Sequence, residues 1–225
     1  HFCHSNFRLI KSQIDRPFDR LFIDLGVSSH QLDRADRGFS FQKDGPLDMR
    51  MNPNEGEPIS DWLAHCSEDE LRDVLFEYGE ESRAKFIARK WVDVRRRGPI
   101  TTTKNFVEAL GSSLTAKNPK GRHPLTRVFQ ALRMKANDEF SVLQELIRDL
   151  PEILSINGRV GILTFHSLED REVKWGLKGR LTPVNKKVLQ ASREESRENP
   201  RSRSAKLRVY TRELKNTEDA NEGRR

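Results

Sequence analysis

Leu21-Phe22-Ile23-Asp24-Leu25 is a short apolar run that is followed by Gly26. A run of this kind predicts a strand that is buried on both faces of a parallel sheet. Residues 159–166 form a second such run, and they predict a second buried strand that ends near His166. Ligands of open α/β sheets bind outside the carboxyl ends of the strands. We therefore expect Asp24 and His166 to lie on one rim of a parallel sheet.

Helical patterns flank the second run. Apolar residues at spacings of three and four follow Pro124, and they predict one long helix that Pro151 ends. After the strand, Ser167 and Asp170 have the spacing of a helix cap, so a further helix is expected to begin there. Residues 206–212 alternate in polarity, which predicts an antiparallel strand at the edge of the sheet. Together these patterns are typical of an α/β fold.

The segment between the first strand and Pro124 is far longer than a usual βα loop, which has about 2–6 residues. It contains three amphipathic patterns that predict helices, and the first follows a capping box formed by Ser67 and Glu70. These patterns indicate an inserted helical cap domain at residues 56–121. Residues 1–55 and 122–225 would then make up the α/β domain.

Charge is unevenly distributed along the chain. Among its 225 residues there are 41 Lys and Arg against 34 Asp and Glu, and the formal net charge is +7. The positive excess lies in residues 171–225, which indicates a polyanionic partner. Nucleic acid is favoured over a membrane surface, because no apolar face accompanies the charge. A solvated tail is the alternative interpretation.

Composition disfavours several other classes of protein. No apolar run reaches the length of about 18 residues that a membrane helix needs, and the two cysteines make neither a disulfide framework nor a thiolate zinc site. His1 and His4 have no third ligand, so no metal site is predicted. The chain begins with His1 and contains no G-x-G turn. We expect a fragment or a processed chain, in which the first strands of a nucleotide-binding fold would precede His1.

Polar residues that suit chemistry gather near both predicted strand ends. Ser28 and, within a glycine-rich connection, Asp48 follow the first strand. Turn formation is the alternative role for residues of this kind. His166 and Ser167 with Asp170 suggest a hydrolase, but Ser167 lacks the G-x-S-x-G environment of a nucleophile. A hydrolase is therefore the least favoured class of enzyme.

Several longer blocks of sequence occur in order along almost the whole chain. They are DLGVSSHQLD at residues 24–33, RGFSF at 37–41, DGPLDMRM at 44–51, YGEE at 78–81, FQALR at 129–133, NDE at 137–139, FHSLEDR at 165–171 and NPRSRSAKLR at 199–208. With these blocks the chain resembles the small-subunit ribosomal RNA methyltransferase H family (RsmH, or MraW). A distant mitochondrial branch has the same pattern.

The resemblance implies a class I AdoMet-dependent methyltransferase, with a Rossmann-like sheet that lacks its first strands here and with an inserted helical domain. It implies methylation of the exocyclic N4 of a cytidine in the decoding region of small-subunit ribosomal RNA. The partner is then this rRNA or the assembled small subunit in the bacterial cytoplasm, with a homodimer left open and no membrane involved. The alternative is a non-catalytic RNA-binding or ribosome-assembly module that has lost the AdoMet loop.

The AdoMet contacts that the resemblance implies fall on Phe7, Asp24 and Gln31. Two residues depart from the family pattern: His30 stands where Pro is common, and Ser5 where Gly is common. The glycine-rich turn of the family, and the acidic residue after its second strand, have no counterpart in this chain. These implied contacts are therefore only part of a cofactor site.

Methylation of a cytosine amine makes a particular demand on the site. The N4 lone pair is delocalised into the ring, so the amine must be oriented toward the methyl donor and must lose a proton as the new bond forms. We hypothesise that Asp48 or His166 contacts this amine, while Ser28 and Ser167 help to position it.

Basic residues near the C-terminus are candidates for contacts with rRNA phosphates. The candidates are Arg201, Arg203, Lys206 and Arg208. Arg95, Arg96 and Arg97 in the insertion form a second candidate patch, for which a solvated helix end is the alternative.

Overall fold

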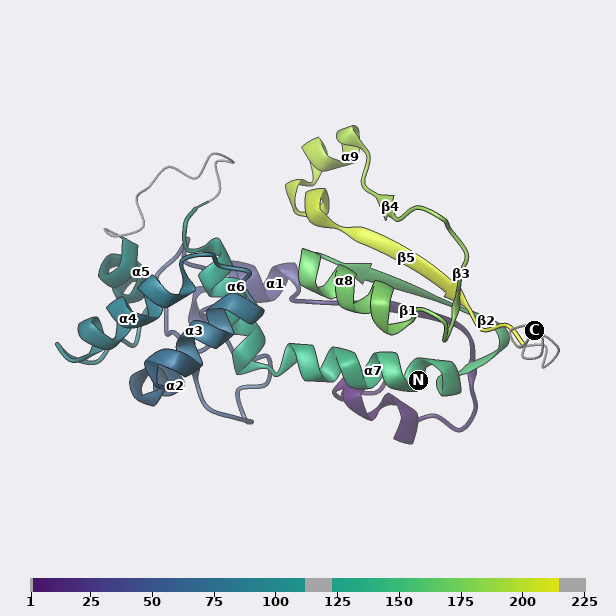
Figure 1. Cartoon of the computed structure of the whole chain (residues 1–225), viewed down its shortest axis with the longest axis horizontal. Coiled ribbons are helices and arrows are strands. Elements are labelled where there is room, and N and C mark those ends of the chain that lie inside the picture. Colours follow the sequence, from purple (N-terminus) through teal and green to yellow (C-terminus); the bar gives the residue numbers. More distant parts are fainter. Residues whose placement is uncertain (1, 112–122, 215–225) are drawn as a thin grey trace, which may run out of the picture. The chain divides into compact units, whose positions relative to one another are not determined.

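The computed structural model describes residues 2–111 and 123–214. They form two compact units (Figure 1). The sheet unit contains the chain up to Gly26 and again from Ser141 onward, and the helical unit runs from Val27 to Phe140. The helical unit is larger than the predicted insertion at residues 56–121, because Leu47 and Met49 lie in its core. The assignment of functional domains to these units remains a prediction.

The sheet unit is built on a parallel pair of strands. Strand β1 (Phe18–Asp24) pairs in parallel with β2 (Leu154–Thr164), as predicted. Strand β5 (Lys206–Thr211) pairs with β2 in antiparallel orientation, also as predicted. The expected edge position of β5 is wrong, because the short strands β3 (Thr182–Pro183) and β4 (Leu189–Gln190) pair with its other side.

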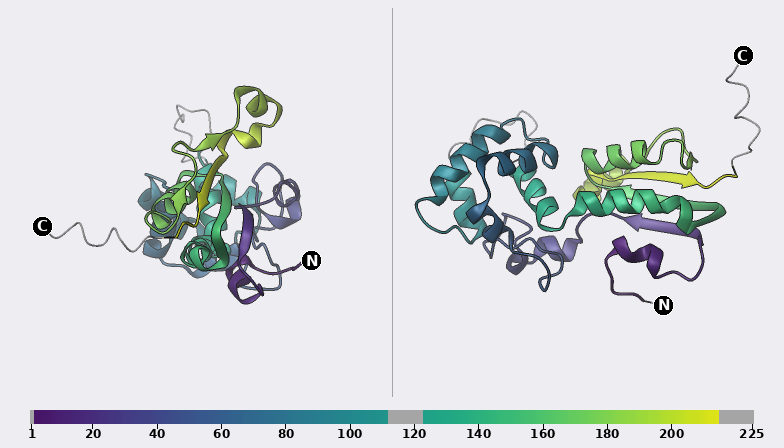
Figure 2. Two further views of the ribbon diagram at one scale, coloured as in Figure 1. Left: turned by 90° about the vertical axis from the view of Figure 1, so that its right-hand side faces the viewer. Right: turned by 60° about the horizontal axis from the view of Figure 1, so that its bottom comes forward.

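One face of this sheet packs against two helices, α7 (Glu139–Ile153) and α8 (Ser167–Gly176). The left view of Figure 2 shows both helices on the same side of the strands. Ile23 and Ile162 face these helices and are buried. Phe22, whose side chain points to the opposite face, is 62% exposed. The prediction that the first strand is buried on both faces is therefore wrong in the described structure.

Short elements complete the sheet unit. The 3-10 helix η1 (Phe7–Ser12) lies against α7, where Arg8 donates to Glu145 at 2.8 Å. Helix α9 (Arg193–Glu198) and the 3-10 helix η3 (Pro200–Ser204) precede β5. The described elements between α8 and β5 are all short.

The described residues of the helical unit form short helices, most of which pack around one apolar core. These helices are α1 (Ser29–Asp33), η2 (Ala35–Arg37), α2 (Ile59–His65), α3 (Glu68–Glu77), α4 (Ala84–Arg95), α5 (Thr103–Gly111) and α6 (Thr126–Ala136). The three predicted insertion helices correspond to α3, α4 and α5, and the capping box of Ser67 and Glu70 is confirmed.

The predicted single helix from Pro124 to Pro151 is wrong. Helix α6 ends at Ala136 and α7 begins at Glu139, because Asp138 adopts a left-handed conformation with a φ of 49°. The Arg133 guanidinium pairs with the Glu139 carboxylate at 2.7 Å across this break. Pro151 does not end α7 but lies within its last turn.

Candidate functional site

The carboxyl ends of β1 and β2 lie side by side at one rim of the sheet unit. Asp24 pairs in register with Leu163, and the amide of Leu25 donates to the Leu163 carbonyl at 3.1 Å. His166 follows Leu163 by three residues. The shared rim predicted for Asp24 and His166 is therefore confirmed. The exposed carboxylate of Asp24 makes no hydrogen bond or ion pair within the described part of the chain.

His166 caps helix α8, whereas the sequence pattern had placed the cap at Ser167. His166 Nδ1 accepts from the amide of Glu169 at 3.4 Å. In return, the Glu169 carboxylate accepts from the amides of Phe165 at 2.9 Å and His166 at 3.3 Å. This reciprocal arrangement is a capping box in which a ring nitrogen replaces the usual hydroxyl. Ser167 is consequently the first residue of the helix and is exposed.

The capping role restricts the chemistry of the His166 ring. Because Nδ1 accepts a hydrogen bond, we infer that a neutral ring carries its proton on Nε2. Nε2 is buried and lies 3.0 Å from Glu169 Oε1, but without the angles of a hydrogen bond. Only 12% of the side chain is exposed. Neither ring nitrogen therefore presents an unused lone pair to a substrate amine.

Asp170, in the first turn of α8, holds two basic residues of β5. Its carboxylate accepts from Lys206 Nζ at 3.1 Å and from Arg208 Nε at 2.8 Å. Burial by itself would raise the pKa of Asp170, but the hydrogen bonds and charges of Arg208 and Lys206 outweigh it and lower this pKa. Asp170 therefore pairs with β5 and not with His166, so a hydrolase triad is not assembled.

The four predicted phosphate-binding residues fall into two classes. Lys206 and Arg208 have side chains only 29% and 19% exposed, because both turn toward Asp170. Arg201 and Arg203 lie on η3 and are exposed. Exposure thus favours Arg201 and Arg203 as the residues that meet a large polyanion.

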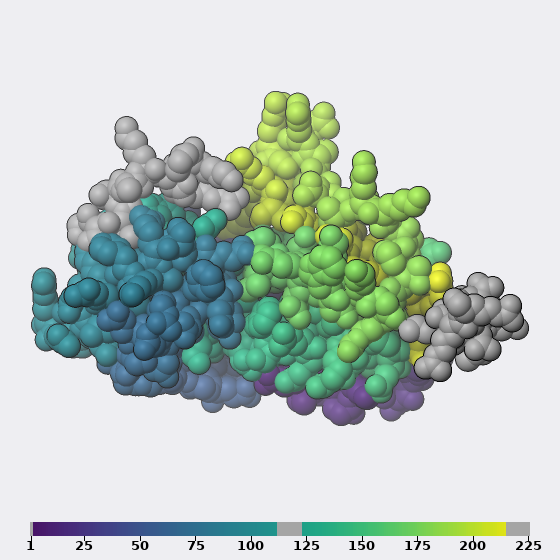
Figure 3. Space-filling model, in the orientation of Figure 1, coloured from purple at the N-terminus to yellow at the C-terminus, as the bar shows by residue number. Residues whose placement is uncertain are grey.

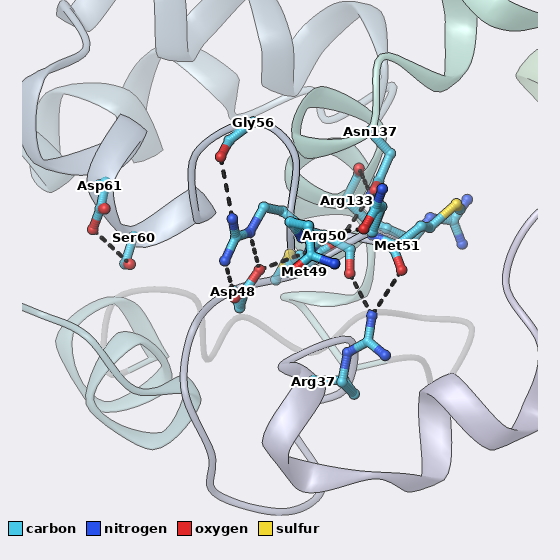
Figure 4. A network of polar contacts seen from close by, with 12 residues as sticks. Arg37, Asp48, Met49, Arg50, Met51, Gly56, Ser60, Asp61, Arg133 and Asn137 are labelled. Carbon is cyan, nitrogen blue, oxygen red and sulfur yellow. Dashed lines mark hydrogen bonds and ion pairs between the residues drawn. The ribbon is translucent and has the colours of Figure 1, made fainter. Parts of the chain in front are cut away.

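In the helical unit, a polar network holds residues 47–51, here called the Met49 loop (Figure 4). Arg37 donates to the carbonyls of Arg50 at 2.7 Å and Met51 at 2.9 Å. Asn137 donates to the Met49 carbonyl at 2.8 Å and accepts from the Met51 amide at 2.6 Å.

The hydrogen bonds of this network surround a residue with an unusual backbone conformation. Met49 is fully buried and has a φ of 62°, a conformation that side chains other than glycine rarely adopt. Such a conformation persists only where the surroundings fix it, and it occurs most often near functional sites. The Met49 loop is therefore a held structure and not a flexible connection.

Asp48 belongs to this loop and pairs with Arg50. Its carboxylate accepts from the Arg50 amide at 3.0 Å, from Nε at 2.7 Å and from Nη2 at 2.8 Å. The hydrogen bonds from Arg50 lower the pKa of Asp48 despite the opposing effect of burial. A carboxylate has about four lone-pair sites, so one acceptor position remains after these three bonds. Asp48 is thus an ionised acceptor that can orient an amine.

The residues expected to contact AdoMet are distributed over both units. Phe7, on η1, has a ring that is 39% exposed, and Asp24 is exposed on the rim of the sheet unit. Gln31, on α1 of the helical unit, accepts from the Ser28 amide at 2.9 Å through Oε1. The side-chain amide nitrogen of Gln31 donates to none of the described residues. Ser28 in turn accepts from the Gln31 amide, so the hydroxyl predicted to position substrate is used as a helix cap.

The second candidate basic patch is also divided. Arg95 donates through Nη1 to the carbonyls of Leu63 and Cys66, which lie at the end of α2. Arg96 and Arg97 are exposed. Arg95 thus donates to the carbonyls at the end of another helix, and only Arg96 and Arg97 remain as exposed members of the candidate patch.

Sequence reasoning missed the residues that hold the predicted ones in place. Glu169, Arg37 and Asn137 all lie within the blocks that carried the family resemblance, but no pattern in the sequence assigned them a partner. Neither the described range 2–111 nor the range 123–214 contains a cluster of three or more residues that could bind a metal ion. No helix in these ranges is long and apolar enough to cross a membrane.

Comparisons with known proteins agree on one family. A family model described as the MraW methylase family matches residues 1–213. A protein of Alcanivorax borkumensis named Ribosomal RNA small subunit methyltransferase H is 44% identical over 217 residues, which cover 88% of this chain and 69% of that protein. Proteins with the same name from Thioalkalivibrio sulfidiphilus and Acaryochloris marina are 39% and 48% identical, with 94% and 87% of this chain covered and 75% and 66% of theirs.

Proposed function

Because this chain belongs to the MraW methylase family, we propose that it transfers a methyl group from AdoMet to the exocyclic N4 of a cytidine in the decoding region of small-subunit ribosomal RNA. The observation that carries the proposal is the rim at the carboxyl ends of β1 and β2, where Asp24 is exposed without a partner in the described structure. Ligands of parallel sheets bind at this position.

The donors and acceptors of this chain fit part of an AdoMet molecule. The Asp24 carboxylate would accept hydrogen bonds from a hydroxyl or ammonium group, the exposed face of Phe7 would contact the adenine, and the Gln31 amide nitrogen would donate. When bound, the cofactor supplies an electrophilic methyl group on a sulfonium. Its binding is testable by calorimetric titration of the chain with AdoMet, where loss of heat in Asp24→Ala would support this assignment.

The residues of the chain have two tasks in the reaction, to orient the amine and to receive its proton. We assign the contact with the target amine to Asp48, through the acceptor position that Arg50 leaves unused. A lowered pKa does not prevent proton transfer, because a protonated amine conjugated with the cytosine ring is a much stronger acid than a carboxyl group. His166 contributes by fixing the start of α8 at the rim, where Ser167 is exposed.

The test is methyl transfer from labelled AdoMet to small ribosomal subunits. Asp48→Asn should lower kcat by about 10²- to 10⁴-fold, the usual contribution of a general acid or base. His166→Ala should lower it less. Asp36→Asn is the matched control, because Asp36 makes an exposed ion pair with Arg34 in the same segment. Equal activity in Asp48→Asn and the wild type would exclude the assignment.

We propose that RNA phosphates contact Arg201 and Arg203 more strongly than Lys206 and Arg208, since Arg201 and Arg203 are exposed whereas the other two side chains are only 29% and 19% exposed. Reversing the charges of Arg201 and Arg203 should reduce the dependence of RNA binding on salt concentration. With fewer phosphate contacts, the protein releases fewer counterions from the RNA when it binds. An unchanged salt dependence would exclude a phosphate role for η3. Arg96 and Arg97 are the second patch to test in the same way.

Binding of AdoMet and formation of methylated product distinguish the proposed enzyme from the non-catalytic alternative. A module that only binds RNA or assists assembly would bind rRNA with the same salt dependence but would neither bind AdoMet nor release methylated product. We expect the reaction in the cytoplasm, on rRNA or on the assembled subunit, and sedimentation of the chain alone would show whether it forms a homodimer.

A further inference from the structure

Helix α8 presents a stripe of basic residues and one tryptophan to solvent. Arg171, Lys174, Trp175 and Lys178 are spaced by three and four residues, so they share one face of the helix and of the turn that follows it. All four are exposed, and Trp175 is 55% exposed. In the orientation of Figure 3, α8 lies at the front surface of the sheet unit. This set is called the Trp175 stripe below.

Two ammonium groups lie close to the ring of Trp175. Lys174 Nζ is 5.0 Å and Lys178 Nζ 4.9 Å from the ring centroid. Neither lysine forms an ion pair with a carboxylate within the described ranges. The acidic side chains of the helix are used elsewhere: Glu169 and Asp170 are buried, and the Glu172 carboxylate accepts from Gln144 at 3.3 Å. The stripe therefore combines an exposed aromatic ring with two lysines, Lys174 and Lys178, that form no ion pair within the described ranges.

The other two tryptophans of the chain behave differently. Trp62 is 7% and Trp91 1% exposed, and both belong to the core of the helical unit. Phe76, on α3, is 65% exposed, but the neighbouring positions on its helix include Asp73 and Glu77. Exposure of a large aromatic side chain thus coincides with nearby basic charge at Trp175 but not at Phe76. Phe86 on α4, which is 52% exposed beside Lys85 and Arg89, shares this feature, but among the three tryptophans only Trp175 is exposed.

We propose that the Trp175 stripe binds single-stranded RNA, with a base stacked on the Trp175 ring and the flanking phosphates paired with Lys174 and Lys178. The inference rests on the proposed function, since it assigns a further contact surface for the RNA substrate. Aromatic rings that stack on bases, set among cations that neutralise phosphates, are the usual means of binding single strands. Apolar association with another protein would instead remove two unpaired ammonium groups from water without compensation.

The position of the stripe relates it to the rim. Trp175 follows His166 by nine residues of helix, which corresponds to about 13 Å along the axis. An RNA strand that stacks on Trp175 therefore has neighbouring nucleotides within reach of the start of α8. The stripe would position unpaired RNA beside the rim at which methyl transfer is proposed.

Intrinsic fluorescence tests the proposal directly, because Trp175 is the exposed tryptophan and the other two are buried. Titration with a single-stranded RNA of about 12 nucleotides and mixed sequence should quench the Trp175 emission to saturation, while a fully paired hairpin should quench it less. Trp175→Ala should weaken binding of the labelled single strand about 5- to 100-fold, as measured by anisotropy. Trp175→Phe should restore most of the affinity because it retains an aromatic ring.

The salt dependence of RNA binding tests the role of Lys174 and Lys178. Lys174→Ala combined with Lys178→Ala should reduce the slope of log K against log salt by about 1.4, since each phosphate contact to a single strand contributes about 0.7. Phe76→Ala and Lys104→Ala, which alter an exposed aromatic and an exposed lysine elsewhere, should leave the affinity and the slope unchanged. Circular dichroism of each variant verifies that it is folded.

The outcomes separate this inference from the function on which it rests. If the wild type binds single-stranded RNA but Trp175→Ala binds it equally well, the stripe is wrong and the RNA methyltransferase proposal stands. If the wild type binds no single-stranded RNA, the stripe inference is overturned, while methyl transfer to small ribosomal subunits decides the proposed function separately. If Trp175→Ala changes only the oligomeric state in size-exclusion chromatography, the surface belongs to a protein interface and the RNA assignment is wrong.

Discussion

The Met49 loop of the helical unit and the start of α8 in the sheet unit both hold residues proposed to act in the reaction, but they do so over different sequence distances. At α8 the contacts are local, since His166 and Glu169 cap the helix within four residues. In the Met49 loop the decisive contacts come from Arg37 and from Asn137, the latter 86 and 88 residues away. Local contacts can be replaced by other capping residues, whereas the long-range contacts have no substitute.

The largest effect is therefore expected at Asn137. Asn137→Ala removes the side-chain bonds to the Met49 carbonyl, the Met51 amide and the Arg133 carbonyl. The Arg133 carbonyl still accepts from the backbone amide of residue 137, but the Met49 carbonyl and the Met51 amide lose this partner. The free energy of unfolding should fall by about 2–4 kcal/mol, since each unsatisfied group costs about 1–3 kcal/mol. Urea denaturation measures the change. Asn105→Ala, at an exposed position of α5, should change stability by less than about 0.5 kcal/mol.

A loss below about 1 kcal/mol in Asn137→Ala would contradict the comparison, because the Met49 loop would then be held without its long-range contact. Asn137→Asp is informative as an intermediate variant. It keeps the oxygen that accepts from Met51 but loses the donor to Met49, so its stability should lie between those of the wild type and Asn137→Ala.

A smaller effect is expected at Asp170, which links α8 to β5. Asp170→Asn leaves the charges of Lys206 and Arg208 without their partner and should cost about 2 kcal/mol at neutral pH. This figure lies below the range for a fully buried pair, because both cations are partly exposed. Chemical denaturation of the two proteins at several pH values gives the difference.

The pH dependence of this difference has a definite sign. The pKa of Asp170 is lowered in the folded state, so its stabilisation is complete above the ordinary carboxyl pKa of about 3.9 and is lost as the pH falls through the lowered value. The wild type and Asp170→Asn should therefore differ most near pH 7 and converge in strong acid. A difference that persists unchanged in acid would show that the ion pairs are not its source.

At His166 the local nature of the cap predicts a modest loss. His166→Ala removes the acceptor for the Glu169 amide and should cost about 1 kcal/mol, the usual value for a helix cap. His166→Asn supplies another good capping side chain and should recover most of this stability, as measured by thermal unfolding. Methyl transfer by His166→Asn distinguishes capping of α8 from direct contact with the target amine. If His166 only caps α8, His166→Asn should recover the activity that His166→Ala loses, together with the stability.

The same contrast explains what could be predicted from the sequence. The parallel pairing of β1 and β2 and the capping box at Ser67 follow from local patterns, and both were confirmed. The break at Asp138 was missed because apolar residues continue at helical spacing across it, while the left-handed turn depends on contacts such as Arg133 with Glu139.

The candidate site was predictable to a similar degree. The rim position of Asp24 and His166 follows from strand order, so it could be inferred from two apolar runs. The pairing of Lys206 and Arg208 with Asp170 could not be inferred from the sequence. Asp170 lies 36 and 38 residues away, and charge patterning does not identify a partner at such a distance. Likewise, the capping function of His166 was assigned to Ser167, since histidine is not among the residues that usually cap helices.

At the end of α4, a local ion pair and a contact between distant segments lie next to each other. The local pair gives the smallest predicted change in the free energy of unfolding. Arg96 forms an exposed pair with Asp93 at 3.7 Å, with side chains 74% and 61% exposed, so Arg96→Ala should change the free energy of unfolding by less than about 0.5 kcal/mol. Its neighbour Arg95 reaches the carbonyls of Leu63 and Cys66 at the end of another helix, and Arg95→Ala should cost about 1–2 kcal/mol. Urea denaturation of both variants tests whether a contact between distant segments, and not charge itself, determines the loss. Equal losses would mean that the two arginines act only through the charge of the helix end.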